Sequence, residues 1–141
     1  MIHYLDTSLL VAALTREVRT AAVQGWLAEQ EPGSFALSDW VVTELSAALS
    51  VKLRSKQVTA RQRADALSLF TVMAEESCVR LPVTADAFHD AARFADQSRA
   101  GLRAGDALHL AVAAKHGLVM VTLDKGLARA ATMLGISSRL M

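Results

Sequence analysis

Short runs of apolar residues alternate along this chain with longer segments whose apolar residues recur at intervals of three and four. Short apolar runs are typical of strands buried on both faces, and the longer pattern is typical of amphipathic helices. The pattern predicts strands at residues 2–5, 34–37, 79–83, 119–122 and 136–140. It predicts helices at residues 9–14, 17–29, from 38 or 39 to about 53, from 59 onwards, 84–97, 106–116 and 126–134.

Residues at the predicted boundaries support several of these elements. Thr59, with Gln62 three positions later, forms a capping-box pattern that starts a helix. Pro82 lacks a backbone donor, so the strand at 79–83 is expected at a sheet edge or a strand end. The residues expected to face inward in three of the helices are Val18, Ala22 and Trp26, then Ala66, Leu67, Phe70 and Ala74, then Ala87, Phe88, Ala91 and Ala95.

Strands that alternate with helices favour an α/β fold with a mainly parallel sheet. The length of 141 residues is typical of one domain, and 52% apolar residues are enough to build a core. We therefore expect a single domain over residues 1–141. In such folds ligands bind beyond the carboxyl ends of the strands.

Charge and cysteine content narrow the function only slightly. A formal net charge of +1 neither requires nor excludes a nucleic acid partner. Cys78 is the only cysteine, so no disulfide framework or cysteine-rich zinc site is expected. No apolar run reaches membrane-spanning length, and Asp6 interrupts the N-terminal apolar segment, which argues against a signal peptide. These features predict a cytoplasmic protein without membrane contact.

Four acidic residues occupy positions that this topology brings towards one rim. Asp6 follows the first strand, and Glu44 lies in the helix after the second. Asp106 begins the helix before the fourth strand, and Asp124 directly follows that strand. Asp106 and His109 are also the only polar side chains between residues 104 and 114, a segment otherwise apolar and therefore buried. The sequence thus predicts carboxylates gathered at a strand-end crevice.

Each of these residues also has an ordinary structural interpretation. Asp6, Asp106 and Asp124 can be helix caps or turn residues, and Glu44 can reach solvent from the edge of its helix. His109 is expected to be a hydrogen-bonded, partly buried residue beside the site rather than a metal ligand, because the other candidate ligands are oxygens. Taken together, however, clustered carboxylates raise each other's pKa unless a cation is present. Oxygen ligands suit Mg²⁺ or Mn²⁺, and two such ions about 4 Å apart can activate water for phosphodiester hydrolysis.

The chain resembles the PIN-domain ribonucleases, and specifically the VapC-type toxins of toxin–antitoxin pairs. The matching segments are Tyr4-Leu5-Asp6-Thr7-Ser8, Val41-Val42-Thr43-Glu44-Leu45, Asp106-Ala107-Leu108-His109-Leu110-Ala111 and Thr122-Leu123-Asp124. This resemblance implies a three-layer α/β/α fold with a five-strand parallel sheet and endoribonuclease activity that depends on Mg²⁺ or Mn²⁺. It implies that the acidic quartet, Asp6, Glu44, Asp106 and Asp124, holds the metal.

The resemblance also implies supporting residues and partners. Thr7 or Ser8, together with Thr122, would orient the carboxylates. Arg103 would meet a substrate phosphate or an antitoxin acid, although a solvated arginine is an equal interpretation. The expected partners are RNA, a cognate antitoxin, a second copy in a homodimer, and the hetero-oligomer of toxin and antitoxin.

Several alternatives remain open at this stage. The basic group, Lys52, Arg54, Lys56, Arg61 and Arg63, can track an RNA backbone, but a solvated helical tip is the favoured reading. Apolar helix faces near Trp40 and Phe70 can serve a dimer or partner contact, although such residues are more often core. A rival enzyme class is an aspartyl phosphatase using Asp6, which lacks the second acid usually found close by. A rival of another class is a catalytically silent RNA- or protein-binding module on the same fold.

Overall fold

A computed structural model describes residues 1–141 and shows five parallel strands in one sheet. The strands are β1 (His3–Leu5), β2 (Phe35–Ser38), β3 (Cys78–Leu81), β4 (Val119–Thr122) and β5 (Ser138–Leu140). Their order is β3-β2-β1-β4-β5. The chain therefore adds β2 and β3 on one side of β1, and then β4 and β5 on the other side. The strand order reverses between β1 and β4, and this is where α/β sheets bind ligands.

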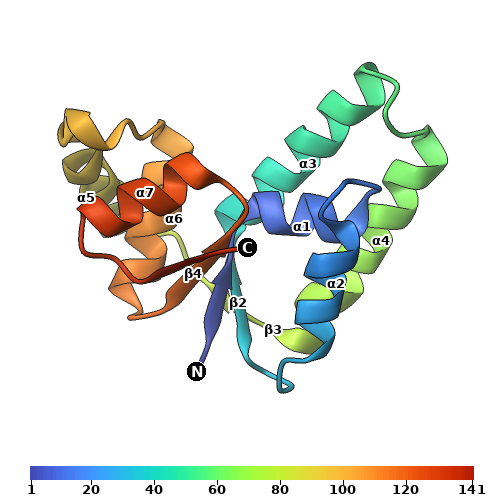
Figure 1. The fold of residues 1–141 in the computed structure, drawn as a ribbon, viewed down its shortest axis with the longest axis horizontal. Helices are drawn as coiled ribbons and strands as arrows, with labels where there is room; N and C mark the ends of the chain where they lie inside the picture. The colour runs from blue at the N-terminus through green and yellow to red at the C-terminus, as the bar shows by residue number, and fades with distance from the viewer.

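Helices cover both faces of this sheet. The connections between β1 and β3 carry α1 (Thr7–Leu14), α2 (Thr20–Ala28), α3 (Asp39–Arg54) and α4 (Ala60–Ser77). The later connections carry α5 (Ala85–Asp96), a short 3₁₀ turn η1 (Ser98–Ala100), α6 (Ala104–Lys115) and α7 (Lys125–Met133). Figure 1 shows α1, α2 and α4 on one side of the strands and α5, α6 and α7 on the other. Because crossovers between parallel strands are right-handed, a reversal of strand order places later helices on the opposite face. The predicted three-layer α/β/α arrangement is confirmed.

The capping and edge signals of the sequence are confirmed. The Thr59 hydroxyl accepts a hydrogen bond from the Gln62 backbone at 3.1 Å, and the Gln62 side chain accepts one from the Thr59 backbone at 2.9 Å. Strand β3 lies at the sheet edge, with Pro82 directly after it. None of the helices combines the length and the apolarity needed to cross a membrane.

Two predicted helix faces are wrong in part: Trp26, Ala87 and Ala91 are buried as expected, but Val18, Ala22, Phe88 and Ala95 are exposed. The predicted helix at 17–29 begins only at Thr20, so Val18 lies in the preceding loop and is fully exposed, and Val23 and Trp26 form the buried face. In α5 the buried residues are Ala87 and Ala91, whereas Phe88 is 55% exposed and Ala95 also faces solvent. Small alanines one turn apart let α5 pack closely on α6, which leaves room for only a narrow inward stripe.

Helix α6 is deeply buried along its middle two turns. Its residues from Ala107 to Ala113 are all buried, so it packs against neighbours on every side over two turns. It contacts α5, α3 and β4. The start of this helix therefore stands on a rigid support beside the carboxyl end of β4.

Candidate metal centre

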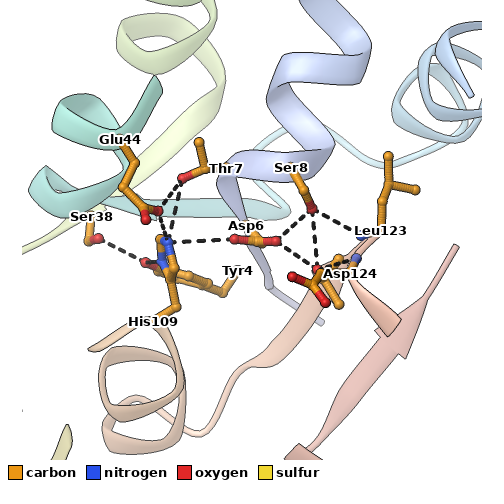
Figure 2. Close-up of polar contacts among 10 residues, drawn as sticks. Tyr4, Asp6, Thr7, Ser8, Ser38, Glu44, His109, Leu123 and Asp124 are labelled. Atoms are coloured by element: carbon orange, nitrogen blue, oxygen red, sulfur yellow. Dashed lines mark hydrogen bonds and ion pairs between the residues drawn. The ribbon is translucent and has the colours of Figure 1, made fainter. Parts of the chain in front are cut away.

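Asp6 follows β1 and is almost completely buried, with 5% of its surface exposed. It occupies the N-cap position of α1, but its side chain makes no capping hydrogen bond. Instead, its Oδ2 accepts hydrogen bonds from the hydroxyls of Ser8 and Thr122, each at 2.6 Å. Figure 2 shows the carboxylate between Ser8 on one side and His109 on the other. The ordinary capping interpretation therefore does not account for this buried acid.

Glu44 reaches the same point from the second turn of α3. Its Oε1 accepts a hydrogen bond from the Thr7 hydroxyl at 2.8 Å and is also in hydrogen-bonding contact with His109 Nε2. Burial disfavours the charged carboxylate, but the hydrogen bonds from His109 and Thr7 and the attraction to the imidazole outweigh it. The result is a lowered pKa for Glu44, which stays ionised.

Asp106 lies in the first turn of α6 and is half-buried. Burial raises the pKa of Asp106, and the negative charges of Asp124, Asp6 and Glu44 raise it further, while His109 only partly opposes them. The negative charges of these acids thus disfavour the ionised form of Asp106. A bound cation would relieve this repulsion.

Asp124 is exposed and caps α7, because its Oδ1 accepts a hydrogen bond from the Leu127 backbone at 3.1 Å. The capping interpretation of this residue is therefore correct. Capping occupies one carboxylate oxygen, and the charge of Asp124 still acts on Asp106. A structural role and a role in the site are compatible for this acid.

The four acids line one open pocket of about 250 Å³, together with Thr7, Ser8, Ala47 and Ala48. This pocket opens at the carboxyl ends of β1 and β4, where the strand order reverses. Four carboxylates and the hydroxyls beside them form a donor set of hard oxygens, which fits Mg²⁺ or Mn²⁺. The residues present therefore suit a divalent cation.

His109 contacts two of the four acids, a role that its position in the sequence does not reveal. It is completely buried, and one atom each of Asp6, Glu44 and His109 lie within 4.8 Å of one another. Its Nε2 is 3.5 Å from Asp6 Oδ1. The one signal in the sequence was a polar residue in an apolar helix, three positions after Asp106. That signal predicts burial with a partner but does not identify the partner.

The expected supporting hydroxyls divide between two carboxylates. Thr7 donates to Glu44, whereas Ser8 and Thr122 donate to Asp6. Ser8 also accepts from the Leu123 backbone at 3.1 Å, which ties the start of α1 to the end of β4. These contacts fix the orientation of the two most enclosed acids.

The positions of the basic residues give little support for RNA binding. Arg103 is exposed at the N-cap position of α6, three residues before the pocket residue Asp106. In the basic group, Lys52 pairs with Glu17 at 2.7 Å, and Arg63 donates to Ser46 and Ser50 of the adjacent helix. These internal contacts favour a structural role for both residues. Phe70, whose helix face the sequence also allows for a partner contact, belongs to the core.

Comparisons with known proteins support the fold. The PIN domain family model matches residues 3–133. The solved structure of FitAcB from Neisseria gonorrhoeae is 20% identical with a TM-score of 0.69, and the match covers 97% of this chain and 96% of that one. The sarcin–ricin loop cleaving toxin VapC20 of Mycobacterium tuberculosis is 20% identical with a TM-score of 0.73, covering 91% and 94%. VapBC2 from Rickettsia felis, bound to a promoter DNA fragment, is 19% identical with a TM-score of 0.68, covering 99% and 98%. No curated protein matches the chain.

Proposed function

The chain belongs to the PIN domain family, and we propose that it is a Mg²⁺- or Mn²⁺-dependent endoribonuclease that acts as the toxin of a toxin–antitoxin pair. The observation that carries this proposal is the convergence of Asp6, Glu44, Asp106 and Asp124 on one pocket at the reversal of strand order. A protein that only binds RNA would gain nothing from clustered carboxylates, which repel a phosphate backbone unless cations intervene.

The four acids would hold the divalent cation. Bound there, it supplies an activated water and stabilises the oxygen that leaves the phosphodiester. The chain's own residues orient the ligands: the hydroxyls of Ser8 and Thr122 occupy one oxygen of Asp6, which leaves Oδ1 for the pocket. Arg103, exposed at the start of α6, would contact a phosphate of the RNA.

The biological role is inferred from relatives. The similar structures include VapBC-5 of Mycobacterium tuberculosis, a member of a family of toxin–antitoxin systems, and a toxin–antitoxin complex from Klebsiella pneumoniae. By analogy, this chain would form a homodimer and bind an antitoxin that blocks the acidic pocket, with an arginine as the natural partner for the carboxylates.

RNA cleavage with added Mg²⁺ or Mn²⁺ tests the activity. We expect cleavage that EDTA stops and that Asp6→Asn or Asp106→Asn abolishes, because each variant removes a charge from the site. Glu76→Gln, an exposed acid of α4, is the matched control and should cleave normally. Full cleavage by both asparagine variants would refute the mechanism. RNA binding without Mn²⁺ binding would instead identify a silent binding module.

Expression in a bacterial host tests the biological role. Growth arrest that Asp6→Asn relieves, and that a neighbouring small reading frame also relieves, would be expected of a toxin. Normal growth with active enzyme in the cells would argue for another role of the nuclease.

A further inference from the structure

A chain of four buried or half-buried polar side chains lies directly beneath the pocket. It runs from Ser38 Oγ to Tyr4 OH at 2.8 Å, from Tyr4 OH to His109 Nδ1 at 2.8 Å, and from His109 Nε2 to Glu44 Oε1. Figure 2 shows these side chains meeting end to end, from β2, β1, α6 and α3. Ser38, Tyr4 and His109 are fully buried. Buried polar groups are costly unless they are hydrogen-bonded, so such a chain has to be complete to be tolerated.

The chemistry of Glu44 sets the direction of the last hydrogen bond in this chain. A carboxylate only accepts hydrogen bonds, so Nε2 of His109 carries the hydrogen that faces Glu44. Nδ1 of the same ring is hydrogen-bonded to the Tyr4 hydroxyl at 2.8 Å, so both ring nitrogens of His109 are held. The Tyr4 hydroxyl is also hydrogen-bonded to Ser38, which is the N-cap residue of α3 yet makes no capping hydrogen bond with its side chain. The chain thus ends on a donor, His109 Nε2, that faces Glu44.

The contacts of Glu44 show what this arrangement does. Both donors, Thr7 and His109, bind the same oxygen, Oε1. The other oxygen, Oε2, lies beside Gly105, where an added Cβ would be only 2.9 Å away. Holding one oxygen of a carboxylate fixes the direction in which the other points. His109 therefore helps to fix the position of Glu44 Oε2 beside the first turn of α6.

We infer that His109, held in place by Tyr4 and Ser38, is a positioning residue that fixes Glu44 for cation binding and does not itself bind the cation. This inference rests on the proposed metal site and assigns to it a residue outside the acidic quartet. Partners of this kind commonly change metal affinity by 10- to 100-fold when removed.

The test is calorimetric titration of the full-length protein with Mn²⁺ alone. His109→Leu fills the space but removes the donor, and we expect Mn²⁺ affinity to fall on the order of 10-fold or more. His109→Gln can place an amide N–H near the Nε2 position and should restore most of the affinity. Tyr4→Phe removes only the hydroxyl and should show a smaller loss. His116→Gln, at the exposed end of the same helix, is the control and should bind as the wild type does.

Two further measurements separate positioning from other roles. In a Glu44→Gln background, His109→Leu should cause no additional loss of Mn²⁺ affinity, because its effect passes through Glu44. Pulsed electron paramagnetic resonance of bound Mn²⁺ should show no nitrogen coupling in the wild type. Nitrogen coupling that disappears in His109→Gln would overturn the inference and make His109 a direct ligand.

The possible failures are distinguishable. A wild-type protein that binds no Mn²⁺ would overturn the metal site and this inference together. A wild type that binds Mn²⁺, with folded His109→Leu and Tyr4→Phe variants of equal affinity, would overturn only the positioning role. If His109→Leu does not fold, His109→Gln and Tyr4→Phe still decide the matter.

Discussion

Substituting Gly105 by alanine should weaken cation binding without unfolding the protein. A Cβ at this position would lie 2.9 Å from Glu44 Oε2 and 3.1 Å from Cζ2 of Trp40. The carboxylate would have to retreat by roughly 0.5 Å to reach ordinary van der Waals separation. Glu44 cannot retreat freely, because Thr7 donates to its Oε1 at 2.8 Å and His109 contacts the same oxygen.

The expected loss follows from those contacts. Hydrogen bonds to charged groups contribute about 1.5–3 kcal/mol each, so we expect their distortion to cost the site on the order of 1.4 kcal/mol. That free energy corresponds to about a 10-fold loss of Mn²⁺ affinity. Alanine is favoured over glycine in helices by up to about 1 kcal/mol, which offsets part of the clash and keeps the free energy of unfolding nearly unchanged.

Calorimetry with Mn²⁺ and thermal unfolding measure the two effects separately. Gly25→Ala in α2 is the matched control, since no atom lies within 4 Å of its added Cβ and its backbone is helical. This control should raise stability slightly and leave Mn²⁺ affinity unchanged. A Gly105→Ala variant that binds Mn²⁺ as tightly as the wild type would refute the assignment of Glu44 Oε2 to the cation.

Three further predictions concern other parts of the molecule. Thr122→Val removes one of the two hydroxyls on Asp6 while keeping the shape of the side chain, and it should lower Mn²⁺ affinity about 10-fold in calorimetry. Asp124→Asn keeps the acceptor for the Leu127 backbone and should weaken Mn²⁺ binding with little change in stability, whereas Asp124→Ala should also lose about 1 kcal/mol of unfolding free energy in denaturant titrations. Equal Mn²⁺ affinity in the wild type, Asp124→Asn and Asp124→Ala would mean that Asp124 acts only as a helix cap. Burial raises the pKa of the Cys78 thiol to about 11, so little thiolate forms at pH 8. Alkylation of Cys78 by iodoacetamide should therefore be slow at pH 8, become faster as the pH rises towards 11, and become fast on unfolding. Rapid alkylation of the native protein at pH 8 would contradict this prediction.

The sequence predicts the sheet and the convergence of the acids for the same reason. Strand ends of a parallel sheet meet at one edge, so residues that follow strands, such as Asp6 and Asp124, are brought together by topology alone. Local patterns predict less well where tertiary packing decides. The apolar stripe of α5 predicts that Phe88 faces inward. In the structure α5 packs closely on α6 through alanines, and Phe88 is exposed.

Long-range hydrogen bonds account for the part of the site that the sequence does not reveal. His109 is 65 residues from Glu44 and 105 residues from Tyr4 along the chain, and no local motif links them. Gly105 is a similar case: only the position of the Glu44 carboxylate against the helix shows why a side chain there is unfavourable. Such contacts depend on how elements pack, which periodicity cannot specify.

The positions of three acids at helix starts are compatible with the proposed metal site. Asp6 and Asp124 occupy the N-cap positions of α1 and α7, and Asp106 lies in the first turn of α6. The N-terminus of a helix carries a partial positive charge that stabilises a nearby anion by about 0.3–1 kcal/mol. Three helix starts pointed at one crevice therefore reduce the cost of gathering the carboxylates before any cation binds. Burial and the charges of the neighbouring acids still raise the pKa of Asp106, so the helix ends lower the cost of the cluster without removing the repulsion that a divalent cation would relieve.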